Sequence, residues 1–119
     1  ARLALYSNSS GSNIITIADS AFSASYFYSA TYSPDKANNT NTGQGWWLLG
    51  HDATQVQSDW IQINLGVPTP VSSVLIGWHV SGSYFSATAT IQGSDDGSTW
   101  TTLKTVTGMT LGSQNTVNL

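Results

Sequence analysis

The sequence contains no cysteine and no glutamate, and only 8% of its residues are charged. Without cysteine, neither a disulfide nor a cysteine-ligated metal site can form, and the cellular compartment is left open. An ordinary domain carries about 25% charged residues, so this surface must be hydrated largely by neutral groups. Serine, threonine, asparagine and glycine supply those groups, a composition that is common in secreted bacterial and viral β-proteins.

Basic residues are also scarce, since Arg2, Lys36 and Lys104 are the three cations and the net charge is −3. Nucleic acids and anionic membrane surfaces are recognised by clustered lysine and arginine, so the sequence argues against both partners. No apolar run approaches the roughly 18 residues of a membrane span. The 119 residues correspond to one domain that can bury a core without disulfides.

Hydrophobic periodicity predicts strands rather than helices. Residues 60–65 alternate strictly, with Ile61, Ile63 and Leu65 on one face, and residues 88–93 alternate again. Residues 71–80 are apolar on both faces near their middle, which indicates a central strand covered on both sides.

Turn residues complete the expected topology. The stretch Asp95-Asp96-Gly97-Ser98 predicts a hairpin turn that leads into a return strand at residues 100–106. Residues 13–17 and 117–119 are weaker strand candidates, and one short helical turn is expected at 34–37. The predicted fold class is therefore all-β, an antiparallel β-sandwich or jelly roll. The 40 residues from 20 to 59 show few clear elements, and long loops on a β-scaffold often carry binding sites.

Four blocks of sequence together resemble a known family. They are PDKANNTNTGQGWW (34–47), SDWIQINLG (58–66), VSSVLIGW (71–78) and IQGSDDGSTWTTL (91–103), in that order. The set resembles the discoidin domains, also called coagulation factor V/VIII type C domains, to which the family 32 carbohydrate-binding modules are related. The resemblance implies an eight-stranded, galactose-binding-like jelly roll whose loops at one end bind a ligand. In bacterial and phage members that ligand is usually a glycan, often galactose-like or an amino sugar. In animal members it is a phospholipid headgroup or a protein.

The sequence departs from the family pattern at several positions. The usual Asp-Gly pair of the calcium loop is Asn39-Thr40, so a calcium ion would rely on the neutral oxygens of Asn39, Asn41 and Thr42, with backbone carbonyls in support. Calcium prefers anionic oxygen ligands, which predicts a weak site or none. The family's closing strand is not recognisable after Val117, which predicts either a divergent ending or a missing last strand in the domain at 1–119.

The adjacent tryptophans Trp46 and Trp47 are the strongest pointer to a site. Neighbouring side chains on an extended backbone point to opposite faces, so only one of the two is easily buried. Trp46 matches the family's framework tryptophan and is expected in the core, as are Trp60 and Trp100. Trp47 then either covers one end of the sandwich or serves as a stacking platform for a sugar ring.

Several polar and aromatic residues accompany Trp47. His51 and Asp52 follow it closely and are suited to hydrogen-bond vicinal hydroxyls, or else form a solvated turn. His79 falls near the position where glycan-binding relatives carry an arginine. Trp78 and Tyr84 flank a Ser-Gly-Ser loop that could face the Trp47 loop. The expected ligand site is thus Trp47, His51, Asp52, Trp78, His79 and Tyr84.

Catalysis is not expected from these residues. Glycosidases need two positioned carboxyl groups, and two of the six aspartates belong to the predicted hairpin. No Gly-x-Ser-x-Gly motif is present, and His51 and His79 are not spaced as a local metal motif.

Two functions of different classes remain. The first is a non-catalytic carbohydrate-binding module at a cell or virion surface, weak as a single site and multivalent in use. The second is a structural or adhesion domain of a larger assembly, such as a phage tail, virion spike or surface layer, in which exposed aromatics contact protein.

Overall fold

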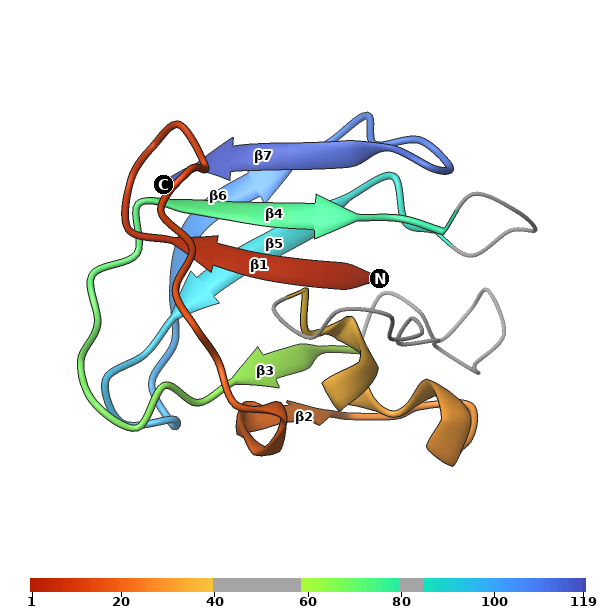
Figure 1. Ribbon diagram of the computed structural model, residues 1–119, viewed down its shortest axis with the longest axis horizontal. Helices are drawn as coiled ribbons and strands as arrows, with labels where there is room; N and C mark the ends of the chain where they lie inside the picture. Colours follow the sequence, from red (N-terminus) through yellow and green to blue (C-terminus); the bar gives the residue numbers. More distant parts are fainter. Residues whose placement is uncertain (40–58, 80–84) are drawn as a thin grey trace.

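The computed structural model describes residues 1–39, 59–79 and 85–119 (Figure 1). Its strands pair antiparallel in three sheets, ordered β1-β4-β7, β2-β3 and β5-β6, which confirms the predicted all-β class. The strands are β1 (Arg2–Tyr6), β2 (Phe22–Ala24), β3 (Ile61–Ile63), β4 (Ser73–Gly77), β5 (Ala89–Gly93), β6 (Thr101–Val106) and β7 (Gln114–Asn118). Within residues 1–39, three short 3-10 helices follow β1: η1 (Asp19–Ala21), η2 (Ala30–Tyr32) and η3 (Pro34–Ala37).

The three-stranded sheet forms one layer, with β4 at its centre as the apolar run at 71–80 predicts. Its register sets Leu3 opposite Ile76, and it sets Leu5 and Val117 on either side of Val74. Directly opposed residues of antiparallel strands project to the same face of the sheet. These five side chains therefore make one apolar face that must be covered.

Two hydrophobic clusters cover that face. The first is centred on Ile17 and Phe22 and is joined by the alternating residues of the β3 region, Ile61, Ile63 and Leu65. The second is centred on Val74, Ile76, Met109 and Val117 and is joined by Ala89, Ile91 and Val106 of the β5–β6 hairpin. Leu3, Leu5 and Trp78 contact both clusters. The strand pair β2–β3 and the hairpin β5–β6 are thus held to the same sheet (Figure 1).

Some elements differ from the sequence prediction. Residues 13–17 do not form a strand, since Ile14 makes only an isolated bridge to Tyr6. The strands β1 and β2 were not predicted, because β1 is rich in leucine and alanine and β2 has three residues. At the other end, the weak candidate at 117–119 is part of β7, which pairs with β4 over residues 114–118.

A buried asparagine fixes the chain after η3. Asn38 is 3% exposed, and its Nδ2 donates to the carbonyl of Ile17 and to the Asp19 carboxylate, both at 2.8 Å. The backbone amide of Asn39 donates to the Leu3 carbonyl at 3.0 Å. These bonds hold the turn predicted at 34–37 against β1, and they place Asn39 beside the start of that strand.

The tip of the β5–β6 hairpin is organised by Asp96. Its carboxylate accepts hydrogen bonds from the backbone amides of Ser98 and Thr99, both at 2.8 Å, and from the Ser94 hydroxyl at 3.0 Å. Gly97 has a φ of 73°, the left-handed conformation that glycine adopts without strain. The predicted turn is confirmed, and the amide hydrogen bonds from Thr99 and Ser98 lower the pKa of Asp96 below its usual value.

Replacing Ile76 with alanine should destabilise the domain by about 2–5 kcal/mol, because it removes buried methyl groups and leaves a cavity beneath β1 and β7. Ile76 is 5% exposed, whereas its neighbour Leu75 points to the opposite face and is only half-buried. Urea unfolding followed by tryptophan fluorescence would measure the free energies of unfolding of Ile76→Ala and of the comparison variant Leu75→Ala. An equal or larger loss in Leu75→Ala would contradict the assignment of the inner face.

The stability of the β5–β6 hairpin should depend on pH through the ionisation of the Asp96 carboxyl. A carboxyl whose pKa is lowered by folding stabilises the protein above its unfolded pKa of about 3.9, and this contribution is lost as pH falls through the lowered value. Asp96→Asn should therefore melt at a lower temperature than the wild type at about pH 7, with the difference shrinking at about pH 2. Asp95→Asn is the control, since no side-chain hydrogen bond of Asp95 occurs among the described residues. A gap that does not shrink in acid would contradict this role.

Candidate functional site

The end of β4 carries two of the residues expected in the site, Trp78 and His79. The Trp78 backbone amide donates to the Ser113 carbonyl at 3.0 Å, and its indole Nε1 lies 3.3 Å from the sulfur of Met109. The His79 carbonyl accepts from the Gly112 amide at 2.9 Å. Both residues are half-buried, and Trp78 packs against both hydrophobic clusters.

Three consecutive aromatic residues follow β2 and stand out from the surface. Tyr26, Phe27 and Tyr28, called here the aromatic run, are 38%, 40% and 65% exposed. The Tyr28 ring lies 6.1 Å from that of Tyr32, centroid to centroid, with the rings inclined at 58°. Sequence analysis did not single out this run. The signal was present, because three adjacent aromatic side chains cannot all reach one core.

Hydrogen bonds anchor the run to the start of β3. The Ser25 hydroxyl donates to the Asp59 carboxylate at 2.9 Å and accepts from the Trp60 amide at 2.9 Å. The Ser25 amide donates to the Trp60 carbonyl at 3.0 Å. These three hydrogen bonds set the start of the aromatic run next to Trp60.

These segments share one end of the sandwich. Strands β2 and β4 end there and β1 and β3 begin there, as Figure 1 shows. That end, called here the ligand end, carries the aromatic run, Trp60, Trp78, His79 and Asn39. Loops at the end of a β-scaffold are common places for binding residues, because the sheets fix their positions.

Trp60 and Trp100 contradict the expectation that both are core residues. They are 49% and 40% exposed. Each tryptophan stands one residue before its strand. By strand alternation, Trp60 points to the face of β3 opposite Ile61, and Trp100 points to the same face of β6 as Thr102. The two clusters are built instead from aliphatic residues, Met109 and Phe22, with Trp78 packed against both.

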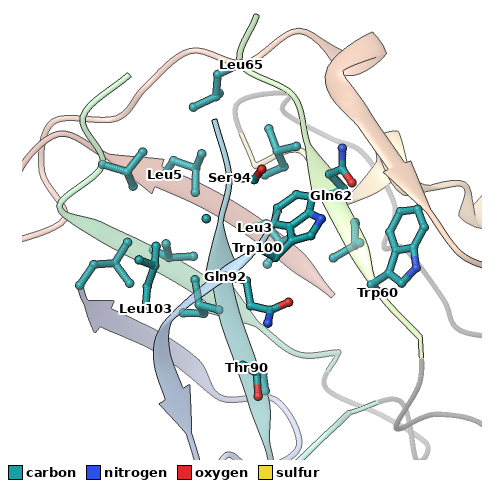
Figure 2. A pocket seen from close by; sticks show the side chains of 18 of the residues that line it. Leu3, Leu5, Trp60, Gln62, Leu65, Thr90, Gln92, Ser94, Trp100 and Leu103 are labelled. Carbon is teal, nitrogen blue, oxygen red and sulfur yellow. The ribbon is translucent and has the colours of Figure 1, made fainter. Parts of the chain in front are cut away.

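An open cavity of about 2350 Å³ lies between the sheets and their connecting loops. Part of its wall is apolar and includes Leu3, Leu5, Val74 and Ile76, so the cavity adjoins the inner face of the central sheet. Other lining residues are tryptophans and neutral polar residues, some of which Figure 2 labels. These are Trp60, Gln62, Thr90, Gln92, Ser94 and Trp100. Among the described residues, the charged ones of the lining are Asp59, Asp95 and Asp96.

The expected calcium ligands are described only in part. Asn39 is half-buried and follows Asn38, whose amide is engaged with Ile17 and Asp19. Among residues 1–39, 59–79 and 85–119, no group of three or more histidine, aspartate or cysteine side chains is placed to hold a metal ion. The donors found here are neutral and do not form the anionic set that calcium prefers, so no function below depends on it.

Other expected residues lie outside the described ranges. They are Asn41, Thr42, Trp47, His51, Asp52 and Tyr84, and their roles stay predictions.

Asp35 of η3 pairs with Lys36 at 3.1 Å. The hydrogen bond that the Ser33 hydroxyl donates to the Asp35 carboxylate lowers the pKa of this carboxyl. That carboxylate is therefore engaged by its neighbours Ser33 and Lys36. No helix in the described part of the chain is long and apolar enough to cross a membrane.

Comparison with known proteins bears out the resemblance seen in the sequence. The model of the F5/8 type C domain matches residues 18–119, whereas no curated protein and no solved structure matches the chain. Domains of this family are generally non-catalytic modules that bind carbohydrates or proteins, usually outside the cell or at its surface. The matched range covers most of the sequence and every described strand except β1. The chain therefore belongs to the F5/8 type C, or discoidin, domain family.

Proposed function

We propose that this domain is a non-catalytic carbohydrate-binding module that binds a neutral or amino sugar at the ligand end. The observation that carries the proposal is the aromatic run, three exposed rings on a segment anchored to β3. An aromatic face packs well against the C–H face of a pyranose ring, and tyrosine adds a hydroxyl that can bond a sugar hydroxyl. Family membership supports a binding role for the loops.

Charge favours the same class of ligand. The carboxylate of Asp59 lies beside the run, and the whole chain has three lysine and arginine residues against six acids. Sialic acids, sulfated glycans and phospholipid headgroups are anionic and would need arginine or lysine to pair with them. A neutral glycan needs only stacking and hydrogen bonds, and an amino sugar would gain from the carboxylate.

The residues expected from the sequence complete this proposed site. Trp78 and His79 stand at the ligand end, and Trp47, His51, Asp52 and Tyr84 are proposed to join them. A single exposed site of this kind binds with a Kd of about 0.1–1 mM, or about −4 to −5.5 kcal/mol. Adhesion at a cell or virion surface would then rest on multivalency, through tandem copies or assembly.

Tyr28→Ala should weaken sugar binding about 10-fold, equivalent to about 1.4 kcal/mol, because it removes the most exposed ring of the run. Tryptophan fluorescence during titration with galactose, N-acetylgalactosamine and N-acetylglucosamine, with and without EDTA, measures this. Val67→Ala is the matched control, since Val67 is 69% exposed but lies in the loop after β3, at the opposite end. Equal affinity of the Tyr28 variant and the control would exclude the run from the site.

Trp47→Ala should abolish sugar binding and leave the circular dichroism spectrum and melting temperature unchanged. The reason is the sequence argument that only one of two adjacent tryptophans is needed for packing. If binding survives, the site lies elsewhere. A different outcome is that no sugar binds the wild type and the protein forms a stable oligomer that buries its exposed aromatic residues. In that case the adhesion or assembly function replaces carbohydrate binding.

A further inference from the structure

We propose that β7 (Gln114–Asn118) is the surface through which two copies of this chain pair, so that their β1-β4-β7 sheets join into one antiparallel sheet. Strand β7 is an edge of its sheet, because β4 pairs with one side of it and no described strand pairs with the other (Figure 1). The unpaired backbone of an edge strand is a template for another strand. Pairing of this kind does not depend on the proposed carbohydrate function.

Hydrogen bonds at the two ends of the β4–β7 ladder show which backbone groups of β7 face β4. The Leu119 amide donates to the Ser72 carbonyl, and the Trp78 amide donates to the Ser113 carbonyl, both at 3.0 Å. In an antiparallel ladder, every second residue of a strand bonds to the same neighbour. The odd-numbered residues from 113 to 119 therefore direct their amides and carbonyls to β4.

The even-numbered residues of β7 direct the same groups away from the sheet. They are Gln114, Thr116 and Asn118, and all three are exposed. Their amides and carbonyls make no hydrogen bond to a neighbour beyond the edge in the described part of the chain. Donors and acceptors thus alternate along an open edge, in the arrangement that a further antiparallel strand needs.

Other described strands carry features that hinder pairing at their edges. The outer side of β1 is covered where the Asn39 amide donates to the Leu3 carbonyl at 3.0 Å. The β5–β6 pair has a register shift between Ile91 and Gln92, and β6 carries Lys104. Strands β2 and β3 have three residues each. Lysine, bulges and short edge strands all prevent unwanted pairing, whereas β7 pairs regularly over five residues and contains no charge, proline or glycine.

A two-fold axis through Thr116 makes this edge complementary to a second copy of itself. Thr116 of one copy then opposes Thr116 of the other, and Gln114 of each copy opposes Asn118 of the other. Each outward amide meets an outward carbonyl in this register. Directly opposed side chains lie on the same face, so threonine meets threonine and amide meets amide, and both kinds of pair can form hydrogen bonds. Although the chain has a net charge of −3, no charged residues meet along this edge.

The size of the edge sets the strength of the association. Strand β7 contributes five residues per copy, whereas a stable interface takes about 20–30 residues from each partner. The dimer is therefore weak, and it forms only as the protein concentration rises.

The direction of β7 decides where the two ligand ends would lie. Strand β7 begins at the ligand end, because it pairs antiparallel with β4, which ends there (Figure 1). Two β7 strands paired antiparallel point the ligand ends of the two copies in opposite directions. If the proposed function holds, the dimer bridges two glycan-bearing surfaces instead of binding one surface twice. Only this consequence, and not the dimer, rests on the proposed function.

Sedimentation velocity of the chain at about 1–500 μM tests the proposal, because mass action makes a weak dimer depend on concentration. For the wild type we expect the weight-average mass to rise from 12.6 kDa towards twice that value. Thr116→Lys should stay at the mass of the monomer, because it sets two lysines opposite each other on the axis. Thr105→Lys is the matched control, since it adds the same charge at an exposed position of β6 and should dimerise like the wild type.

A charge-swapped pair of variants tests the register and shows that the variants fold. Thr116→Glu alone should also stay monomeric, whereas an equimolar mixture of Thr116→Lys and Thr116→Glu should recover the dimer, because opposite charges then meet on the axis. A wild type that stays monomeric over the whole range overturns the proposal. A dimer that Thr116→Lys leaves intact overturns it too, as does a mixture that does not recover the dimer. The carbohydrate-binding proposal stands or falls separately, by the sugar titrations.

Discussion

Covering the apolar inner face of the β1-β4-β7 sheet is the constraint on which the rest of the structure depends. Leu3, Leu5, Val74, Ile76 and Val117 project to that face, and water must be excluded from all of them together. Two strand pairs pack on this face, β2–β3 through the aliphatic residues of β3 and β5–β6 through Ala89, Ile91 and Val106. Neither pair is stable alone, since isolated two-stranded sheets are marginal in water.

This arrangement buries the aliphatic residues of the two clusters and leaves several aromatic residues of the described part of the chain exposed. Phe22 is buried, whereas the aromatic run, Trp60 and Trp100 are exposed. A protein with few charges cannot keep such rings in water without a cost of about 25 cal/mol per Å² of apolar surface. The proposed glycan would cover the aromatic run and offset this cost.

The scarcity of charge has a second consequence, for specificity. With three lysine and arginine residues in the chain and aspartates around the cavity, the protein has little means to hold an anion. The proposed recognition of a neutral glycan would instead rest on stacking and on hydrogen bonds with hydroxyl, amide and carboxylate groups, which are individually weak. Several copies of the domain acting together would strengthen such binding.

The sequence by itself determined the family, the all-β class, the central position of β4, the hairpin turn at Asp96 and the 3-10 turn at 34–37, because alternation, turn residues and block order are local signals. Tertiary structure decided the rest. β1 and β2 form because partners cover them, which their composition does not reveal. Trp60 and Trp100 carry the family's strand pattern yet stand outside the core, and the aromatic run meets them only through Ser25 and Asp59. Which residues share an end or a wall depends on pairing between segments about 35 residues apart, and no local pattern encodes that distance.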